Sequence, residues 1–195
     1  MKTRNETEIK LKVRNSKDLR WRLTEQGFRP ITARHFESNI LFDFPDLRLR
    51  KSRSLIRLRY MGDEALLTYK GAPMRSRDYK IRPEFETRVE DGHRVHEILL
   101  HLGLREMFAY EKYRTIYAPR GKNSAANPPH LTFDETPVGN YIELEGPQRW
   151  IDEVARQLGY SRRDYIKDSY AALYRKKCQR EGKVPGDMVF PKRES

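Results

Sequence analysis

The sequence predicts an α+β protein built on an eight-stranded antiparallel β-barrel, with a charged lumen and with helices packed on the outside. Two observations lead to this prediction. Segments that alternate charged and apolar residues recur along the chain, and segments with the apolar spacing of helices lie between them. Because these helices need apolar surfaces to pack on, the apolar strand faces are expected outside and the charged faces inside a closed barrel.

The first alternating segment sets the pattern for the others. In a strand, Glu6, Glu8 and Lys10 share one face, while Ile9 and Leu11 share the opposite face. Two carboxylates beside an ammonium group are typical of a cation site. On its own this arrangement is weak evidence, and it gains weight because later segments repeat it.

The remaining elements follow in order, separated by turn and capping residues such as Ser16, Gly27 and Pro45. Further extended segments are expected over 30–43, 55–60, 66–70, 79–89, a long strand carrying Lys112 and Arg114, 131–134 and 141–145. Helices are expected over 16–27, 91–102, 147–158 and 168–179. Residues 1–179 are expected to form one domain and 180–195 a basic flexible tail, and the composition of 119–129 is typical of a mobile loop.

Composition limits the classes of function. The 195 residues carry a formal charge of +12, which favours a polyanionic partner. Cys178 is the only cysteine, so an intramolecular disulfide and a cysteine-based zinc site are excluded. No apolar run has the length of about 20 residues that a membrane span needs, and no secretory segment is recognised. We therefore expect a soluble, cytoplasmic protein without a membrane partner.

The charges on the predicted inner faces indicate the ligand. Six cations (Lys10, Arg57, Arg59, Lys70, Lys112 and Arg114) stand against seven carboxylates (Glu6, Glu8, Glu84, Glu86, Asp134, Glu143 and Glu145). This balance of one negative charge would not attract a phosphate chain. Two divalent cations would make the set positive, and oxygen ligands favour Mg²⁺ or Mn²⁺. Arginine and lysine would then bind the remaining phosphate oxygens, so a metal-bound triphosphate is the predicted substrate.

The same residues, in the same order, resemble the pattern of the CYTH domain, the family of triphosphate tunnel metalloenzymes. The motif opens with Glu6-x-Glu8-x-Lys10, and the resemblance extends over roughly residues 4–175. Leu41 stands where some triphosphatases of the family carry an aromatic residue, so the stretch around it is nearer to the cyclase-like bacterial branch. The resemblance implies an eight-stranded tunnel with acidic residues on metal and basic residues on triphosphate. It also implies that Lys167, before the last helix, reaches into the tunnel.

The predicted function is that of an Mg²⁺- or Mn²⁺-dependent enzyme acting on a nucleoside or inorganic triphosphate. The seven carboxylates would hold metal, Lys167 and the six cations would bind phosphate, and Lys10, Arg59 and Lys70 would offset the charge of the transition state. Water attack would release phosphate, whereas attack by the ribose 3′-hydroxyl of ATP would yield cyclic AMP and pyrophosphate. The sequence does not choose between these two reactions.

A rival of a different class is a non-catalytic barrel that binds polyphosphate, nucleotide or RNA. RNA binding would be favoured by aromatic residues among the lumen charges, and the predicted inner faces show few. The basic residues could also be structural partners of the carboxylates, because such ion-pair networks occur without function. The sequence leaves the oligomeric state open, a homodimer included.

Overall fold

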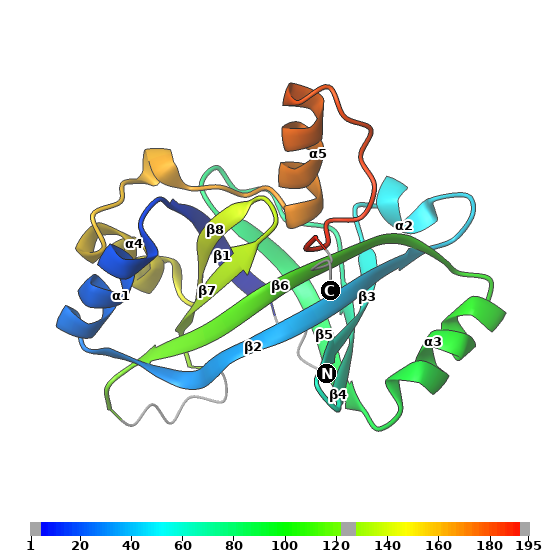
Figure 1. Ribbon diagram of the computed structural model, residues 1–195, viewed down its shortest axis with the longest axis horizontal. Coiled ribbons are helices and arrows are strands. Elements are labelled where there is room, and N and C mark those ends of the chain that lie inside the picture. Colours follow the sequence, from blue (N-terminus) through cyan, green and yellow to red (C-terminus); the bar gives the residue numbers. More distant parts are fainter. Residues whose placement is uncertain (1–4, 122–127, 192–195) are drawn as a thin grey trace.

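The computed structural model describes residues 5–121 and 128–191, and its centre is a closed barrel of eight antiparallel strands (Figure 1). The strands are β1 (Asn5–Val13), β2 (Phe28–Asp43), β3 (Leu55–Met61), β4 (Glu64–Lys70), β5 (Lys80–Val89), β6 (Arg105–Pro119), β7 (His130–Thr136) and β8 (Gly139–Glu145). Their order around the barrel is β1-β5-β4-β3-β2-β6-β7-β8, and β1 pairs with both β5 and β8 to close it. The predicted fold class is confirmed.

The described chain also has five α-helices and one 3-10 helix, and the last three of these follow β8. They are α1 (Ser16–Glu25), α2 (Arg48–Lys51), α3 (Gly92–His101), α4 (Gln148–Gln157), η1 (Arg162–Asp164) and α5 (Tyr170–Arg180). The cap of α1 is Asn15, one residue before the expected Ser16, and its side chain accepts from the backbone N–H groups of Lys17 and Asp18. None of the helices is long and apolar enough to cross a membrane.

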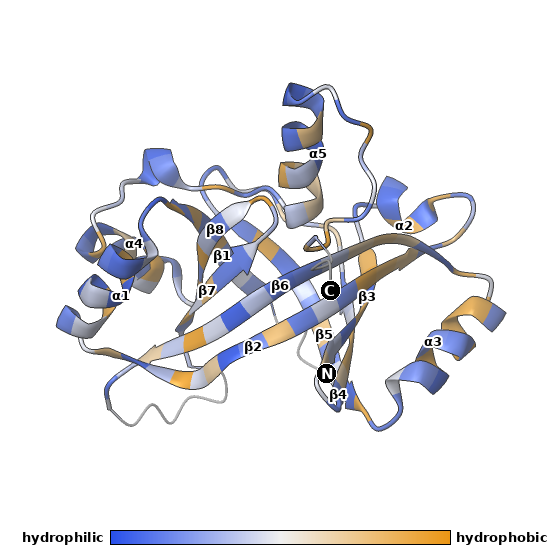
Figure 2. Cartoon of the chain, in the orientation of Figure 1, coloured by the Kyte–Doolittle hydropathy of each residue, from blue (hydrophilic) through white to orange (hydrophobic). Residues whose placement is uncertain are grey.

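Apolar and charged residues alternate along the strands, which puts the apolar side chains on the outer face and the charged ones toward the lumen. Figure 2 shows the corresponding change of hydropathy from residue to residue. In β1, Ile9 and Leu11 are buried on the outer face, where Leu19 and Leu23 of α1 and Ile151 of α4 belong to the same apolar cluster. Figure 1 shows α1 and α4 together beside β1, β7 and β8. This packing holds the charged face of β1 toward the lumen.

A second apolar cluster lies where α3 packs on the other side of the barrel. Leu99 of α3 contacts a cluster that includes Phe42 of β2 and Leu58 of β3. Gly92 lets the start of α3 approach closely, because a Cβ atom there would lie 2.6 Å from the Cβ of Ala65. The Tyr60 hydroxyl donates to the Gly92 carbonyl at 3.1 Å. With both sides covered, the barrel interior is left to the polar side chains.

A third cluster seals one end of the lumen. Tyr170, the first residue of α5, packs with Tyr110 of β6, Tyr141 of β8 and Met188. Met188 is fully buried, and its backbone N–H donates to the Ala109 carbonyl at 2.9 Å. The flexibility expected of residues 180–195 therefore does not extend to the segment around Met188, because backbone pairing with β6 and burial of its side chain hold it in place. The loop expected over 119–129 lies mostly outside the described residues.

We expect Met188→Ala to lower the free energy of unfolding by about 2–5 kcal/mol, because it removes a fully buried side chain from this cluster. The matched control is Val184→Ala, since Val184 is 93% exposed in the same segment, and its effect should stay within about 0.5 kcal/mol. Urea unfolding of the two variants measures the difference. Equal, small effects would show that the segment does not pack on the barrel in solution.

Candidate active site

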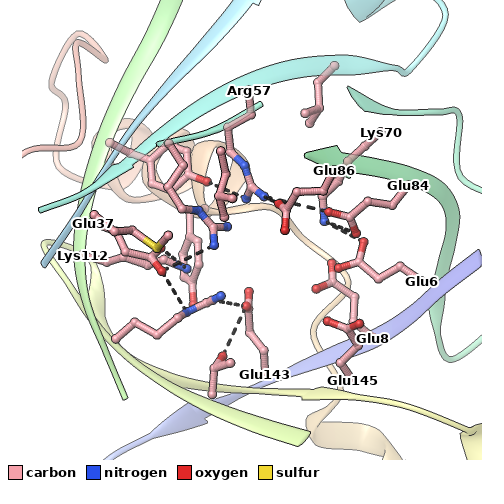
Figure 3. Close-up of a pocket in the computed structure, with 18 of the residues that line it drawn as sticks. Glu6, Glu8, Glu37, Arg57, Lys70, Glu84, Glu86, Lys112, Glu143 and Glu145 are labelled. Carbon is pink, nitrogen blue, oxygen red and sulfur yellow. Dashed lines mark hydrogen bonds and ion pairs between the residues drawn. The ribbon is translucent and has the colours of Figure 1, made fainter. Parts of the chain in front are cut away.

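The barrel encloses a cavity of about 1470 Å³ whose wall is dominated by charged side chains (Figure 3). It brings together all the predicted site residues except Asp134 and Lys167. It adds three charged residues that the sequence analysis left unassigned, namely Glu37, Lys80 and Arg82. Apart from Glu64 and Arg88, which pair with each other at exposed positions, the lining holds eight lysines and arginines against seven carboxylates. The net charge of these lining residues is thus +1, whereas the sequence analysis gave −1 for the predicted inner faces.

The signs of these charges are sorted around the barrel. Glu6 and Glu8 of β1, Glu84 and Glu86 of β5, and Glu143 and Glu145 of β8 come from three adjacent strands. Arg57 and Arg59 of β3 and Lys112 and Arg114 of β6 come from the strands on either side of β2. Figure 3 shows Glu6, Glu8, Glu84 and Glu145 together on one side of the cavity, with Glu37 and Lys112 on the opposite side. The lumen therefore has a mainly acidic half and a mainly basic half.

Ion pairs inside the acidic half satisfy its carboxylates. The Lys70 ammonium lies 2.6 Å from Glu6 and 3.0 Å from Glu84, and Lys80 lies 2.6 Å from Glu8. Lys10 lies 2.8 Å from Glu143 and 3.7 Å from Glu8. Although burial works in the opposite direction, the ammonium groups of Lys10 and Lys80 hold the pKa of Glu8 well below its usual range.

Glu6 behaves differently from Glu8. Burial, followed by the neighbouring charge of Glu8, raises the pKa of Glu6 to about 7. The Lys70 ammonium lies between Glu6 and Glu84, at 2.6 Å and 3.0 Å. Burial, followed by the Glu6 charge, also raises the pKa of Glu145. This concentration of acidic oxygens fits a divalent cation.

The same carboxylates are not yet arranged as a metal cage. Within residues 5–121 and 128–191, no group of three or more His, Cys, Asp or Glu side chains is placed so that it could hold a metal ion. The structure gives the reason, since lysine ammonium groups lie against Glu6, Glu8, Glu84 and Glu143. A cation would have to displace these ammonium groups, and they would then be available to an anion.

In the basic half, the arginines are close together and only partly neutralised. Arg57 lies 3.2 Å from Glu86, and Arg59 donates to the Asn39 side chain at 3.1 Å. Burial, followed by the charge of Arg57, lowers the pKa of Arg59 from its ordinary value. The buried Nε of Arg57 finds no hydrogen-bond partner among the described residues. Crowded guanidinium groups of this kind favour a polyanion as ligand.

The structure does not give Asp134 the environment expected of the predicted metal ligand. It is fully buried and is not part of the cavity wall. Arg114 donates to its two carboxylate oxygens at 2.6 Å each, Lys112 donates at 3.1 Å, and the Tyr170 hydroxyl donates at 2.6 Å. With these four bonds its oxygens are already occupied. Asp134 is instead the anchor that ties β6 and the start of α5 to β7.

Lys167 also lies elsewhere than predicted. Its side chain is exposed, and its ammonium group donates to the backbone carbonyls of Ser76 at 3.1 Å and Arg77 at 2.6 Å. It does not line the cavity. In this structure Lys167 ties the connection between β4 and β5 to the segment before α5, which is the physical reason that it does not reach the lumen.

Several residues of the site were not predicted from the sequence. Glu37, Lys80 and Arg82 had a signal, because each stands on the charged face of a predicted strand. The guanidinium of Arg82 donates to the backbone carbonyls of Gly71 and Lys70, which gives it a structural role. Tyr170 had no such signal, because only the fold brings the first residue of α5 onto the barrel end.

The titration of Glu6 gives a testable pH dependence. Because its pKa in the fold is raised above the ordinary value, Glu6 contributes stability below about pH 4.5, and this is lost as the pH rises through about 7. Glu6→Gln stays neutral, so its stability relative to the wild type should increase between these pH values. Urea unfolding in EDTA at several pH values measures the difference, with Glu25→Gln on α1 as a control. A difference that stays constant or falls with pH would contradict the raised pKa.

This combination of fold and site defines a class, namely antiparallel barrels whose charged tunnel is suited to a polyanionic ligand. The CYTH domain family model matches residues 4–170, and the chain belongs to the CYTH domain family. A Methanocaldococcus jannaschii protein named a "putative adenylate cyclase" is 27% identical over 178 residues, covering 86% of this chain and 97% of that protein. The expected CYTH-type enzyme acting on a triphosphate is confirmed at the level of the family.

Solved structures share the fold. A Vibrio parahaemolyticus protein described in the same terms as the Methanocaldococcus jannaschii relative has a TM-score of 0.76 at 17% identity, covering 88% of this chain and 98% of that one. The PH1819 protein of Pyrococcus horikoshii has a TM-score of 0.71 at 23% identity, with 88% and 99% coverage. A Hippeastrum protein for which a dominant triphosphatase activity is described has a TM-score of 0.60 at 16% identity, with 92% and 97% coverage.

Proposed function

We propose that this protein is a divalent-metal-dependent triphosphatase that binds its substrate in the barrel lumen. The observation that carries the proposal is the division of the cavity into an acidic half and a basic half. In the free protein the two kinds of charge satisfy each other. A triphosphate and its metal ions offer both kinds a better partner at once, because carboxylates bind the cations and ammonium and guanidinium groups bind the phosphate oxygens.

Five glutamates of the acidic half would hold the metal, namely Glu6, Glu8, Glu84, Glu143 and Glu145. Glu86 is set apart from these by Arg57, which lies 3.2 Å away, and supports the site by orienting that arginine. Bound Mg²⁺ or Mn²⁺ would neutralise phosphate charge and polarise the group that is attacked. Asp134 is left out of this set because protein donors already occupy its oxygens.

The basic residues bind and orient the triphosphate. Arg57 and Arg59 of β3 and Lys112 of β6 come from the strands on either side of β2, which lies across the barrel from β1, and would fix the phosphate chain along the lumen. Lys10 and Lys70 would turn from their glutamates to phosphate oxygens and offset the charge that develops during transfer.

Hydrolysis requires only these groups and a water molecule placed in line with the bond that breaks. Cyclisation of ATP would in addition require a place for the nucleoside that presents its 3′-hydroxyl to the α-phosphorus. The specific observation that favours cyclisation is the relative from Methanocaldococcus jannaschii, whose name describes it as an adenylate cyclase candidate. We therefore keep adenylyl cyclase as the second candidate function.

Inorganic triphosphate, ATP and thiamine triphosphate, each with Mg²⁺ or Mn²⁺, form the panel that tests the proposal. The products to be measured are phosphate, pyrophosphate and cyclic AMP. We expect phosphate release that is lost in EDTA. Equal amounts of cyclic AMP and pyrophosphate from ATP would establish the cyclase instead. Tight binding of the panel without any product would show a non-catalytic polyphosphate or nucleotide binder.

A further inference from the structure

His35 is a cavity-lining residue of β2 for which the proposed mechanism has no use. Its Nδ1 lies 2.9 Å from the backbone carbonyl oxygen of Ala33, and its Nε2 lies 3.3 Å from a carboxylate oxygen of Glu37. A carbonyl and a carboxylate can only accept hydrogen bonds. Both ring nitrogens must therefore donate, which requires the doubly protonated imidazolium. The geometry thus gives His35 a positive charge that the sequence did not indicate.

Glu37 holds this charge in place. It is 1% exposed, and besides His35 it faces Lys112 at 3.4 Å, Arg59 at 3.5 Å and Arg114 at 4.0 Å. His35 itself faces Glu37 from its own strand and Arg114 from β6, and Glu37 links it to Arg59 of β3 and Lys112 of β6. The hydrogen bond with Glu37 raises the pKa of His35, although burial and Arg114 act against it.

His35 is also placed where an anion can reach it. Its side chain is 25% exposed, and in the β2–β6 pairing it stands opposite Arg114, whose side chain also lines the cavity. Its bond to Glu37 is long at 3.3 Å, and Glu37 would keep three other cations without it. The Nε2–H group of His35 can therefore exchange its hydrogen bond to Glu37 for one to an anion at little cost in free energy.

We propose that His35 is an additional phosphate-binding residue of the lumen, which donates from Nε2 to a phosphate oxygen on the β2–β6 wall beside Arg114. Glu37 is its positioning residue. This inference rests on the proposed function and deepens it, because it makes binding of the triphosphate depend on the protonation of an imidazole. Lysine and arginine do not change charge around neutral pH, so they cannot supply this dependence.

The direction of the pH dependence of triphosphate binding follows from the protonated form of His35. The contribution of His35 to affinity is fully present below the pKa of its ring and is lost as the pH rises through it. Glu6, whose pKa is raised to about 7, has the opposite effect, because its deprotonation favours the metal. The two effects are separated by comparing variants at one pH rather than by the profile of the wild type alone.

The test is calorimetry with inorganic triphosphate and Mg²⁺ on the wild type, His35→Gln and His35→Arg. At about pH 6 the glutamine variant should bind about tenfold more weakly than the wild type, the effect of losing one charge-assisted hydrogen bond. At a pH above the pKa of the ring, where the ring is neutral, this ratio should fall to about one. The arginine variant should keep its affinity at both pH values. His101→Gln, on the outer helix α3, is the matched control and should change nothing.

Two outcomes would overturn the inference alone. One is a wild-type protein that binds triphosphate while His35→Gln shows the same affinity ratio at both pH values. The other is a neutral imidazole at His35 at about pH 6 in nitrogen NMR spectra of the free protein. If the folded wild type binds no triphosphate at either pH, the proposed function fails, and the inference that rests on it fails as well.

Discussion

Replacing Asp134 by alanine should lower the free energy of unfolding by about 3–5 kcal/mol, the cost of leaving buried partner charges without their counter-ion. The variant removes the bidentate partner of Arg114 and the nearest carboxylate of Lys112, whose side chains are 10% and 2% exposed, and leaves them only Glu37 and Glu143. It also removes the acceptor of the Tyr170 hydroxyl. Because Tyr170 begins α5, the loss should also loosen the sealed end of the barrel. Urea unfolding in the absence of metal measures this effect.

The neighbouring Glu135 provides a matched control. Its carboxylate lies 2.7 Å from Arg34, and the side chains of Arg34 and Glu135 are 47% and 26% exposed. Glu135→Ala should therefore cost less than about 1 kcal/mol. If Asp134→Ala keeps the stability of the wild type but weakens the binding of Mg²⁺, Asp134 is the metal ligand that the sequence predicted and not a structural anchor.

Replacing Glu8 by glutamine should reduce turnover of the triphosphate by about 100-fold or more, because a metal ligand contributes several kcal/mol to charge stabilisation. Glutamine has nearly the same shape, so the 6% exposed site should stay packed. Lys80, 2.6 Å from Glu8, loses its counter-ion, so a moderate loss of stability is expected as well. Thermal unfolding beside the kinetic assay separates the two effects.

The control for Glu8 is Glu64→Gln. Glu64 pairs with Arg88 at 2.7 Å, and both side chains are more than half exposed. Its loss should leave turnover nearly unchanged, since exposed pairs contribute little. Turnover of Glu8→Gln at the level of the wild type, in a folded protein, would remove Glu8 from the proposed metal site.

The alternation along the strands was sufficient to predict the barrel and most of its lumen. Glu6 and Lys10 were placed by the period of two and by the apolar Ile9 between them, and their burial inside the barrel confirms that pattern. Glu37 stood on the charged face of its segment as well. It was not assigned because local periodicity gives the face of a residue but not the residues opposite it.

Contacts between distant segments account for what the sequence could not supply. The alternation placed Asp134 on the inner face correctly, but only the closed barrel brings Arg114 and Tyr170 against its oxygens. Lys167 was assigned by resemblance, yet the path of the chain before α5 directs its ammonium to the carbonyls of Ser76 and Arg77. Met188 gave no local signal, since its burial depends on pairing with β6.

The division of the lumen between carboxylates for metal and basic residues for phosphate is tested most directly by calorimetry of inorganic triphosphate binding, with Mg²⁺ and with EDTA. The account predicts that Mg²⁺ tightens binding by about 100-fold or more, because without metal the phosphate must compete with glutamates for every lysine and arginine. The same dissociation constant in Mg²⁺ and in EDTA would contradict it.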